Sequence, residues 1–331
     1  MRVTVIGRVA FAAALEIAIV ASSLPAARAA EAYPSKPIRL LVGFAPGGAN
    51  DLVARAVATR LGPRLGQQVV VENRSGAGGN IATELVARST PDGYTMLLAS
   101  VASFAMSPAM LDKIPFDPIH DFAPVSRAAL VTSLLSVHPS MPSRSLKEFV
   151  GAAKQYPGKL NYATPGVGSI AHLSSELFWK TAGIHLNHVP YKGGNPAVVD
   201  AMAGHVESIF SLISTQTPHV RARRLRAIAV SSAKRSAALP NVPTIAEGGY
   251  RGFAASGWLG VVFPAKTPSA IVERINREMM AILNTREVQT QLEDLGLDAE
   301  PSTPAEFLAL IKSDYAMWGK LIREAGIKGG D

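Results

Sequence analysis

The chain has 331 residues, enough for about two domains of ordinary size. Hydrophobic residues make up 48% and charged residues 18%, which predicts a folded protein with a sizeable core and argues against disorder. The absence of cysteine excludes a disulfide framework, cysteine-ligated metal centres and a thiol nucleophile.

The chain is basic, with a formal net charge of +8. Its first 29 residues hold three arginines and one glutamate, so the charge without them is +6. This charge favours an anionic ligand or a polyanionic surface nearby. The densest basic cluster is Arg221, Arg223, Arg224 and Arg226. Nucleic-acid binding is the alternative, but no helix-turn-helix, zinc-finger or RNP pattern supports it, and we expect no nucleic-acid partner.

Residues 1–29 have the features of a signal peptide. Two arginines come before an apolar stretch at 9–24, and an Ala-Arg-Ala sequence ends at Ala29. We predict cleavage after Ala29 and export. The alternative is a membrane anchor, but the stretch is short for a span, and Glu16 would be costly inside one. No later segment has 18 uninterrupted apolar residues, so we expect no span in the mature chain.

From residue 30 onward, short apolar runs alternate with helical patterns. The runs interpreted as strands in the first region are 38–44, 68–72 and 94–99. The patterns interpreted as its helices are 50–65 and 80–88. Strands separated by helices in this way predict a parallel, doubly wound sheet.

The middle of the chain repeats this style and predicts a second α/β unit. Its expected strands are 133–137, 161–163, 188–191, 208–212 and 225–231. Its expected helices are 146–156, 169–182 and 195–203. The first of these helices opens at a capping box formed by Ser145 and Glu148.

The last third predicts one strand, 256–263, and three helices. We expect the first helix to start at Thr267-Pro268, with Thr267 as the N-cap, and the second to cover 285–295 before Gly296. A capping box from Thr303 to Glu306 opens the last helix, which runs to about residue 325. We expect these helices to return to the first unit, so one lobe would combine residues 30–130 with 254–331, and the other would cover 131–253.

Four loops after predicted strands are rich in Gly, Ser, Thr and Asn. They are 45–51, 73–80, 100–103 and 164–169, called loops one to four below. Ligands bind at the carboxyl ends of parallel strands, where glycine permits close backbone approach and a helix start offers free N–H groups to an anion. Together the loops predict a site for a small carboxylate, which forms charge-assisted hydrogen bonds with N–H donors. Alternatively they are ordinary turns, in which Asn50, Asp51 or Ser169 serves only as an N-cap.

No other motif points to chemistry. The chain has no phosphate-binding P-loop, no G-x-G-x-x-G spacing and no G-x-S-x-G elbow. His185 and His188 are neighbours without a third metal ligand, and His172 is either a ligand contact or a packing residue. We therefore expect no catalytic residue, no metal and no cofactor. The apolar runs 178–179 and 261–263 are expected in the core.

Several motifs, in order along the chain, carry a resemblance to a known family. They are YPSKPI at 33–38, FAPGG at 44–48, VENRSGAGGN at 71–80, PDGYT at 91–95, DFAPV at 121–125, HVPYKG at 188–193 and LPNVPT at 239–244. From about residue 33 to the end, the sequence resembles the Bug-type solute-binding receptors of tripartite tricarboxylate transporters.

The resemblance implies a two-lobe periplasmic-binding-protein fold of the α/β class, the "Venus flytrap", with a mostly parallel sheet flanked by helices in each lobe. It also implies a ligand cleft between the lobes, which captures a small carboxylated compound for the membrane subunits of a transporter. The positions that match the family's ligand site are Phe44, Ala45, Gly47, Gly48, Asn50, Asp51, Ser100, Ser103, Thr164, Gly166, Ser169, His172 and Ser211.

Two positions bear on the ligand. Many relatives have Asp where this chain has Ser211, and that Asp can select a ligand amine, so the resemblance argues here against an amino acid and for an uncharged or purely anionic substituent. Val101 and Phe104 in and after loop three predict a drier pocket that tolerates aromatic groups.

The resemblance implies lobes that close over the ligand without covalent chemistry. Two other functions share the expected features. An exported hydrolase on this kind of fold would need a nucleophile–base pair, which the sequence does not show. A ligand sensor that reports to a membrane partner would use the same cleft. We expect a monomer in either receptor role.

Overall fold

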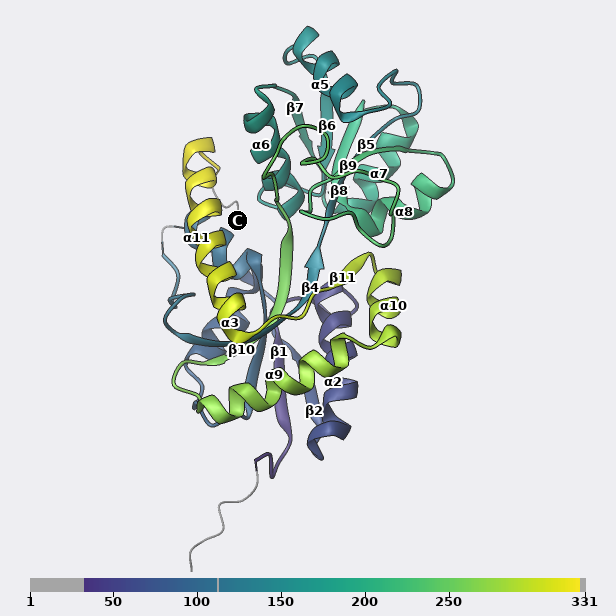
Figure 1. The fold of residues 1–331 in the computed structure, drawn as a ribbon. Coiled ribbons are helices and arrows are strands. Elements are labelled where there is room, and N and C mark those ends of the chain that lie inside the picture. The colour runs from purple at the N-terminus through teal and green to yellow at the C-terminus, as the bar shows by residue number, and fades with distance from the viewer. Residues whose placement is uncertain (1–32, 112, 328–331) are drawn as a thin grey trace, which may run out of the picture. The chain divides into compact units, whose positions relative to one another are not determined.

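The computed structural model describes residues 33–111 and 113–327. All helices and strands named below belong to one unit, Lys36–Asp331, and Figure 1 shows how they are arranged. The predicted signal peptide at 1–29 lies outside the described residues, so its cleavage stays a prediction. Among the helices that are described, none combines the length and the apolar character that a membrane crossing requires.

The first sheet takes its strands from distant parts of the chain. They are β1 (Ile38–Val42), β2 (Val69–Asn73), β3 (Thr95–Ser100), β4 (Phe122–Val131), β10 (Gly257–Pro264) and β11 (Leu297–Ala299). Their order in space is β11-β4-β10-β3-β1-β2. β1 pairs in parallel with β2 and β3, whereas β10 runs antiparallel to β3 and β4, and β11 antiparallel to β4.

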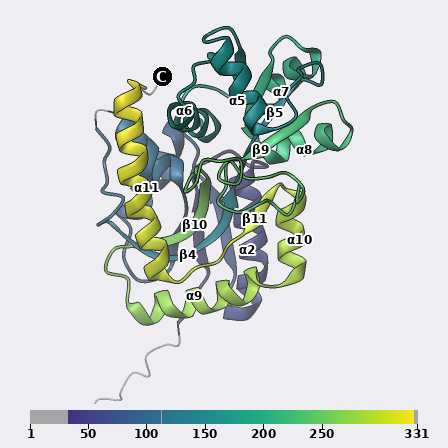
Figure 2. The same cartoon turned by 45° about the horizontal axis from the view of Figure 1, so that its top comes forward.

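Helices from both ends of the chain cover this sheet. They are α2 (Ala49–Leu65), the 3-10 turn η1 (Ala77–Gly79), α3 (Asn80–Ala87), the π-helical turn η2 (Ala102–Met106), α4 (Ser107–Met110), α9 (Ser269–Leu283), α10 (Arg286–Asp294) and α11 (Pro304–Ala325). α9 packs on α2 and β4, and α11 packs on β4 and η2, as Figure 2 lets the reader follow. The expected return of the last helices to the first sheet is confirmed.

The second sheet is built from one continuous stretch of chain. Its strands are β5 (Ser133–Val137), β6 (Asn161–Thr164), β7 (Asn187–Pro190), β8 (Ser208–Leu212) and β9 (Arg226–Val230), in the order β7-β6-β8-β5-β9. Its helices are α5 (Leu146–Gln155), α6 (Ile170–Ala182), α7 (Gly194–Ala203) and α8 (Ile213–Arg221). Each sheet with its own helices is called a lobe below, the first containing β1 and the second containing β6.

Both sheets are mixed, which corrects the expectation of mostly parallel pairing. In the second sheet, β6 pairs in parallel with β7 and β8, while β5 is antiparallel to β8 and β9. The cause is the path of the chain. β4 leads into the second lobe and β10 leads back from it, so these two neighbouring strands run in opposite directions.

Most predicted elements are present within one or two residues, but β4, α4, α8, β11 and the short turns η1 and η2 were missed. β4 contains Pro124 and Arg127, which break the apolar alternation of a typical strand. α8 follows β8 without a loop and contains Pro218, so neither a turn signal nor a regular helical pattern marks it.

The helix starts test the predicted caps. The capping box of α11 is complete, because the Thr303 side chain accepts from the N–H of Glu306 and the Glu306 carboxylate accepts from the N–H of Thr303. In α5 only half of it forms: Ser145 caps the helix, but the Glu148 carboxylate accepts from Arg144 N–H instead. The predicted Thr267 cap is wrong. Pro268 is the N-cap of α9, and the Thr267 hydroxyl donates to the carbonyl of Pro264.

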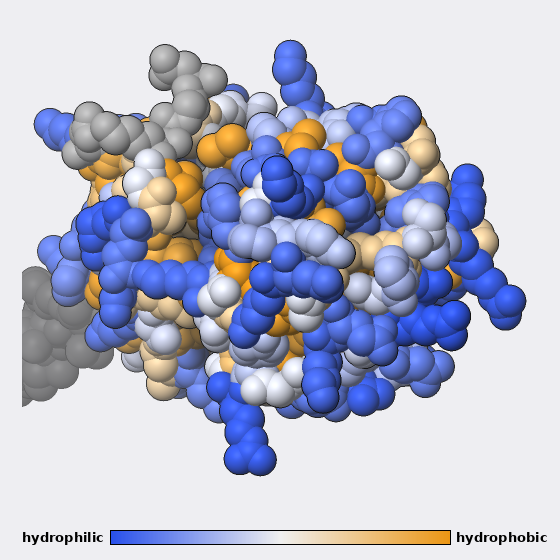
Figure 3. All heavy atoms as spheres, turned by 90° about the horizontal axis from the view of Figure 1, so that it is seen from above, coloured by the Kyte–Doolittle hydropathy of each residue, from blue (hydrophilic) through white to orange (hydrophobic). Residues whose placement is uncertain are grey.

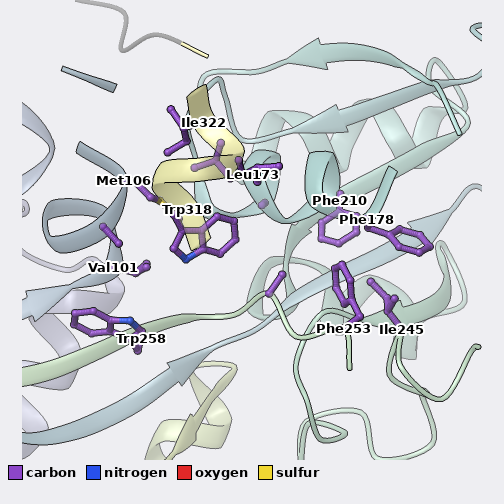
Figure 4. Close-up of a cluster of buried hydrophobic side chains, with 14 of the residues drawn as sticks. Val101, Met106, Leu173, Phe178, Phe210, Ile245, Phe253, Trp258, Trp318 and Ile322 are labelled. Carbon is purple, nitrogen blue, oxygen red and sulfur yellow. The ribbon is translucent and has the colours of Figure 1, made fainter. Parts of the chain in front are cut away.

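One cluster of buried apolar side chains includes residues of both lobes. Figure 4 shows Trp318 and Ile322 of α11 near Leu173 of α6, and Trp258 of β10 on the side of the first lobe. The two expected core runs are buried, and they include Phe178, Trp179 and Phe263. Figure 3 views one face, where hydrophilic side chains project over most of the surface. Burial of this apolar surface is the main force that holds the fold.

Candidate functional site

Loops one to three meet at one edge of the first sheet. They follow β1, β2 and β3, which are adjacent and parallel, so their carboxyl ends lie side by side. Gly43 brings the segment after β1 against the start of α3, since a Cβ on Gly43 would lie 2.6 Å from the Cα of Gly79. Only glycine permits this approach, which sets loop one beside loop two.

Asp51 fastens loop one from inside. Its side chain is 3% exposed, and one carboxylate oxygen, Oδ2, accepts from the Gly47 N–H at 2.9 Å and from Arg55 Nε at 2.9 Å. The other oxygen, Oδ1, accepts from Asn73 Nδ2 at 3.0 Å. These bonds, with that from Arg55 first, lower the pKa of Asp51 to about 2. Asp51 therefore positions the loop, with its own oxygens already occupied.

Next to the hydrogen bonds of Asp51, the N-terminus of α2 is open. Its N-cap is Gly48, which has no side chain to satisfy the first-turn N–H groups, and loop one is exposed from Ala45 to Gly48. Asn50 and Asp51 are thus not N-caps. An uncapped helix start attracts anions through its free N–H groups and the helix dipole.

Two buried polar atoms near this helix start have no hydrogen-bond partner. They are Nδ2 of Asn50 and Oγ of Ser100, the last residue of β3. Ser103 is also buried, and its hydroxyl donates to the carbonyl of Ser100 over a long 3.4 Å. Phe44 is half-buried, and its ring lies against Gly79. An unpaired buried polar group is costly, so such atoms mark places where a polar ligand or water fits.

Loop four follows β6 in the second lobe and is fastened by hydroxyl groups. The Ser169 hydroxyl accepts from His172 N–H at 3.2 Å and donates to the Gly166 carbonyl at 2.8 Å, so Ser169 is the N-cap of α6. Thr164 is fully buried, and its hydroxyl accepts from the Gly166 N–H at 3.3 Å. Gly166 has a φ of +139°, which an L side chain rarely adopts.

Two neutral histidines stack beneath this loop. The rings of His172 and His188 are 4.1 Å apart and nearly parallel, and His188 also stacks on Tyr162. Nδ1 of His172 accepts from the Gly168 N–H at 3.1 Å, so its proton is on Nε2. Nε2 of His188 hydrogen-bonds the Thr164 hydroxyl at 2.7 Å. Burial lowers the pKa of both rings to about 4, and that of His172 is lowered further by His188.

Ser211 lies in β8, next to β6, and is fully buried. Its hydroxyl lies 3.3 Å from that of Thr215 in α8. A Cβ on Gly194, at the start of α7, would come within 3.2 Å of the Ser211 oxygen. α7 has no side-chain cap, so Ser211 lies beside one further uncapped helix start. The start of α8 is occupied, because the Ile213 N–H donates to the Thr132 carbonyl at 3.0 Å and a Cβ on Gly296 would lie 2.7 Å from the Ser214 nitrogen.

The loop regions of the two lobes approach each other at two places. A Cβ on Gly168 of loop four would lie 3.1 Å from Sδ of Met110, which ends α4 beyond loop three. A Cβ on Gly257 would lie 3.3 Å from both Val101 and Ile170, the first residue of α6. Loop three and loop four are therefore neighbours.

The expectation about Phe104 is wrong. Its ring is fully buried, 4.9 Å from the ring of Phe122 and 6.0 Å from that of Trp258, so it packs in the apolar core. Val101 is 5% exposed and packs toward Gly257. The turn η2 directs these side chains inward, which apolar composition alone did not indicate.

The basic cluster is used within the second lobe. Arg226 donates to the carbonyls of Pro139, Met141 and Ser143, and Arg221 donates to that of Ala238. Arg221 and Arg226 therefore tie backbone segments together, whereas Arg223 and Arg224 are exposed.

Sequence reasoning missed the supporting residues of the site. They are Arg55, His188 and Thr215, whereas Asn73 and Asn80 lie within the predicted loop two. Only the spacing of Asp51 and Arg55, four residues apart on one helix, could have been found in advance. In the described part of the chain, no group of three metal-binding side chains occurs.

A family model for the tripartite tricarboxylate transporter family receptor matches residues 53–327. The chain belongs to this family. It is 39% identical over 320 residues to a UPF0065 protein from the tcbD–tcbE intergenic region of Pseudomonas sp. strain P51, a match that covers 96% of this chain and 95% of the relative. It is 37% identical over 317 residues to BugT of Bordetella pertussis, covering 96% and 97%.

Solved structures of similar receptors agree. The R. palustris protein Rpa4515, solved with adipate, is 35% identical, with a TM-score of 0.74 over 89% of this chain and 99% of that one. MatC of Rhodopseudomonas palustris, solved with malate, is 29% identical, with a TM-score of 0.69 over 88% and 100%. The chain is thus a solute-binding receptor of the Bug type with the two-lobe periplasmic-binding-protein fold, and not an enzyme.

Proposed function

We propose that this receptor captures a small carboxylate in a cleft between its lobes and delivers it to the membrane subunits of a tripartite transporter. One wall of the cleft is formed by loops one and three, in the lobe made of residues 30–130 and 254–331. The other wall is formed by loop four and Ser211, in the lobe made of residues 131–253. The observation that carries the proposal is the uncapped N-terminus of α2 beside the unpartnered Asn50 Nδ2. These are donors, and a carboxylate offers only acceptors.

Each lobe contributes neutral donors to the proposed site. Around the first wall these are the N–H groups of Gly48 and α2 and the Asn50 amide. Around the second they are the Nε2–H of His172 and the uncapped start of α7. Helix dipoles and backbone N–H groups stabilise a carboxylate on both sides, and no group of the site is placed to react with it.

The ligand class follows from the same residues. Ser211 provides a hydroxyl and no charge, so the second wall has no counterion for an amine. Adipate and malate, which two relatives hold, are dicarboxylates without an amine. We therefore propose an aliphatic or hydroxylated carboxylate without an amino group, held in the periplasm after cleavage following Ala29, by a monomeric receptor.

The experiment is thermal unfolding of the mature protein with a panel of mono- and dicarboxylates and amino acids. A carboxylate that binds raises the melting temperature in proportion to RT ln(1 + [L]/Kd) and is recovered unchanged. Stabilisation by amino acids alone, or conversion of a panel compound, would contradict the proposal.

Gly48→Val gives the residue-level test. Gly48 has an ordinary negative φ, and a Cβ there meets only the Ala45 carbonyl, at 3.6 Å, so the fold tolerates the change while the added methyls cover the start of α2. Ligand stabilisation should disappear. The matched control is Gly151→Val on α5, where a Cβ has open space, and it should leave ligand stabilisation intact.

A further inference from the structure

A cavity of about 410 Å³ lies away from the predicted ligand site. It is lined by residues of β4, β10, β11, α11 and the segment that leaves β9, and no predicted ligand-binding residue lines it. The volume is that of a small organic ligand. The polar groups of this cavity, called the junction cavity below, decide what chemistry fits it.

The most buried charged group in its wall is Asp314 of α11, whose residue is 7% exposed. One of its oxygens accepts from Trp258 Nε1 at 2.8 Å. Burial raises the pKa of Asp314 to about 6, and the bond from Trp258 and the charge of Arg127 offset only part of this rise. Ser256, on the same wall, has a buried hydroxyl oxygen with no hydrogen-bond partner.

The cations around the junction cavity are mostly committed elsewhere. Arg127 binds the Glu300 carboxylate at 3.1 Å, and Arg235 binds that of Glu247 at 3.0 Å. Lys234 lines the cavity as well. Arg127 is near enough to act on Asp314 through its charge, but its guanidinium is bound to Glu300. The buried carboxylate thus lacks a salt-bridge partner of its own.

The rest of the wall is apolar and includes one aromatic ring. Leu310 and Met317 flank Asp314 on α11, three or four residues away, so all three face the same side of the helix. Leu130 of β4 lies opposite Trp258 of β10 in the strand register. Figure 4 shows Trp258 with its indole nitrogen, the atom that donates to Asp314. An indole ring beside a carboxylate is a favourable surrounding for an ammonium group.

We propose that the junction cavity binds an organic amine with an apolar body, such as an arylalkylammonium ion. The ammonium group lies between the Asp314 carboxylate and the Ser256 hydroxyl, and the apolar body covers Trp258, Leu310 and Met317. The amine supplies the positively charged partner that the Asp314 carboxylate lacks. Its charge is opposite to that of the carboxylates expected at loops one to four. This site is independent of the proposed carboxylate site in position and in charge.

The junction cavity also spans the connection between the lobes. Asp298 of β11 accepts from the Ser236 hydroxyl and from the Ala237 N–H, each at 3.2 Å. β11 belongs to the first sheet, whereas Ser236 and Ala237 follow β9 of the second. If the lobes move when a carboxylate binds, which rests on the proposed function, an amine in this cavity changes carboxylate affinity, and the carboxylate changes amine affinity by the same factor.

The test is calorimetric titration of the mature protein with 2-phenylethylamine, alongside 3-phenylpropionate and 2-phenylethanol, which keep the aromatic body but change the charge. We expect the amine to bind at least ten-fold more tightly than either. Asp314→Asn should weaken the amine at least ten-fold, and Asp294→Asn, an exposed acid outside the cavity wall, should leave it unchanged. Equal affinity for all three compounds, or no binding of the amine, overturns the proposal.

Two further variants test the position of the ammonium group and separate the amine site from the carboxylate site. Ser256→Ala removes the unpartnered hydroxyl without adding volume and should weaken the amine about three-fold, so full affinity in this variant counts against the assigned position even if Asp314→Asn does not fold. Gly48→Val should leave amine binding unchanged. Loss of carboxylate binding with retained amine binding separates the two sites, and failure of either one leaves the other measurable.

Discussion

Loop one and loop four occupy equivalent places, each after a parallel strand and before a helix, yet they are held by opposite chemistry. In loop one a buried, ionised Asp51 gathers Gly47, Arg55 and Asn73. In loop four two neutral imidazoles stack, and hydroxyl groups tie the turn. In both loops the strand-to-helix geometry presents the N–H groups, whereas the side chains that hold the loop in place can be charged or neutral. The two loops should therefore respond to pH in different ranges.

The largest expected effect is acid destabilisation of loop four. The folded pKa of His172 and His188 is about 4, below the ordinary 6.5, so the unfolded chain takes up protons first. Their stability contribution is complete above pH 6.5 and is lost as the pH falls toward 4. The loss should be on the order of 3 kcal/mol. The measurement is urea unfolding of the wild type against His172→Gln/His188→Gln across this range.

The difference between these two proteins removes the contribution of other groups, among them Asp314, whose raised pKa acts in the opposite direction. His185→Gln, at an exposed histidine of the same lobe, is the control and should leave the stability close to that of the wild type at each pH. If the double variant follows the wild-type profile, the stack is not the acid-sensitive element.

The second largest effect is the loss of stability expected when Asp51, the charged group that holds loop one, is replaced. Asp51→Ala leaves the Gly47 N–H and the Asn73 amide without their acceptor, which should cost about 2–3 kcal/mol and abolish stabilisation by the carboxylate ligand. Denaturant unfolding at pH 7 measures the cost. Asp294→Ala, on the exposed side of α10, is the control.

In the wild type, the pKa of about 2 keeps Asp51 ionised, so its contribution is present above pH 4 and is lost only as the pH falls from 4 to 2. Comparing the pH profiles of Asp51→Ala and the wild type checks this window. A difference that vanishes already at pH 5 would show that loop one depends on another group.

A smaller effect is expected at the hydroxyl of loop four. Thr164→Val keeps the shape of the side chain but removes the bond to His188 Nε2 and the acceptor for the Gly166 N–H. We expect a loss of about 1 kcal/mol, measured by denaturant unfolding. The pKa of His188 gives a second readout, followed by NMR titration of the ring. An unchanged stability would mean that stacking alone holds this ring.

The smallest loss of stability is expected when Arg55, the exposed partner of Asp51, is replaced. The Arg55 side chain is 52% exposed, so Arg55→Met should cost only about 0.5 kcal/mol. The pKa of Asp51 should nevertheless rise toward 3.8, because the bond from Arg55 is the first cause of its lowering. NMR titration of the carboxyl group measures this rise. A pKa that stays near 2 would assign the lowering to Gly47 and Asn73 instead.

The lobe architecture could be predicted largely from the sequence, and the details of the site could not. The strand that ends at Val42 and the helix after it are visible in the apolar periodicity, and so are the loops between them. The roles of Asp51 and Phe104 were not visible, since each depends on partners from other segments. The sequence named the positions of the candidate site, and the structure separates those that face outward from those that fasten the loops.

What the sequence by itself determined is local: the alternation of strands and helices, the capping box at Thr303 and the motifs of the receptor family. These depend on neighbours within a few residues, which periodicity and capping chemistry encode. Only the tertiary structure decided the antiparallel pairing of β4 with β10, the histidine stack and the junction cavity. Each joins residues far apart in the chain, as Trp258 and Asp314 are, and chain folding alone brings such groups to within a hydrogen bond.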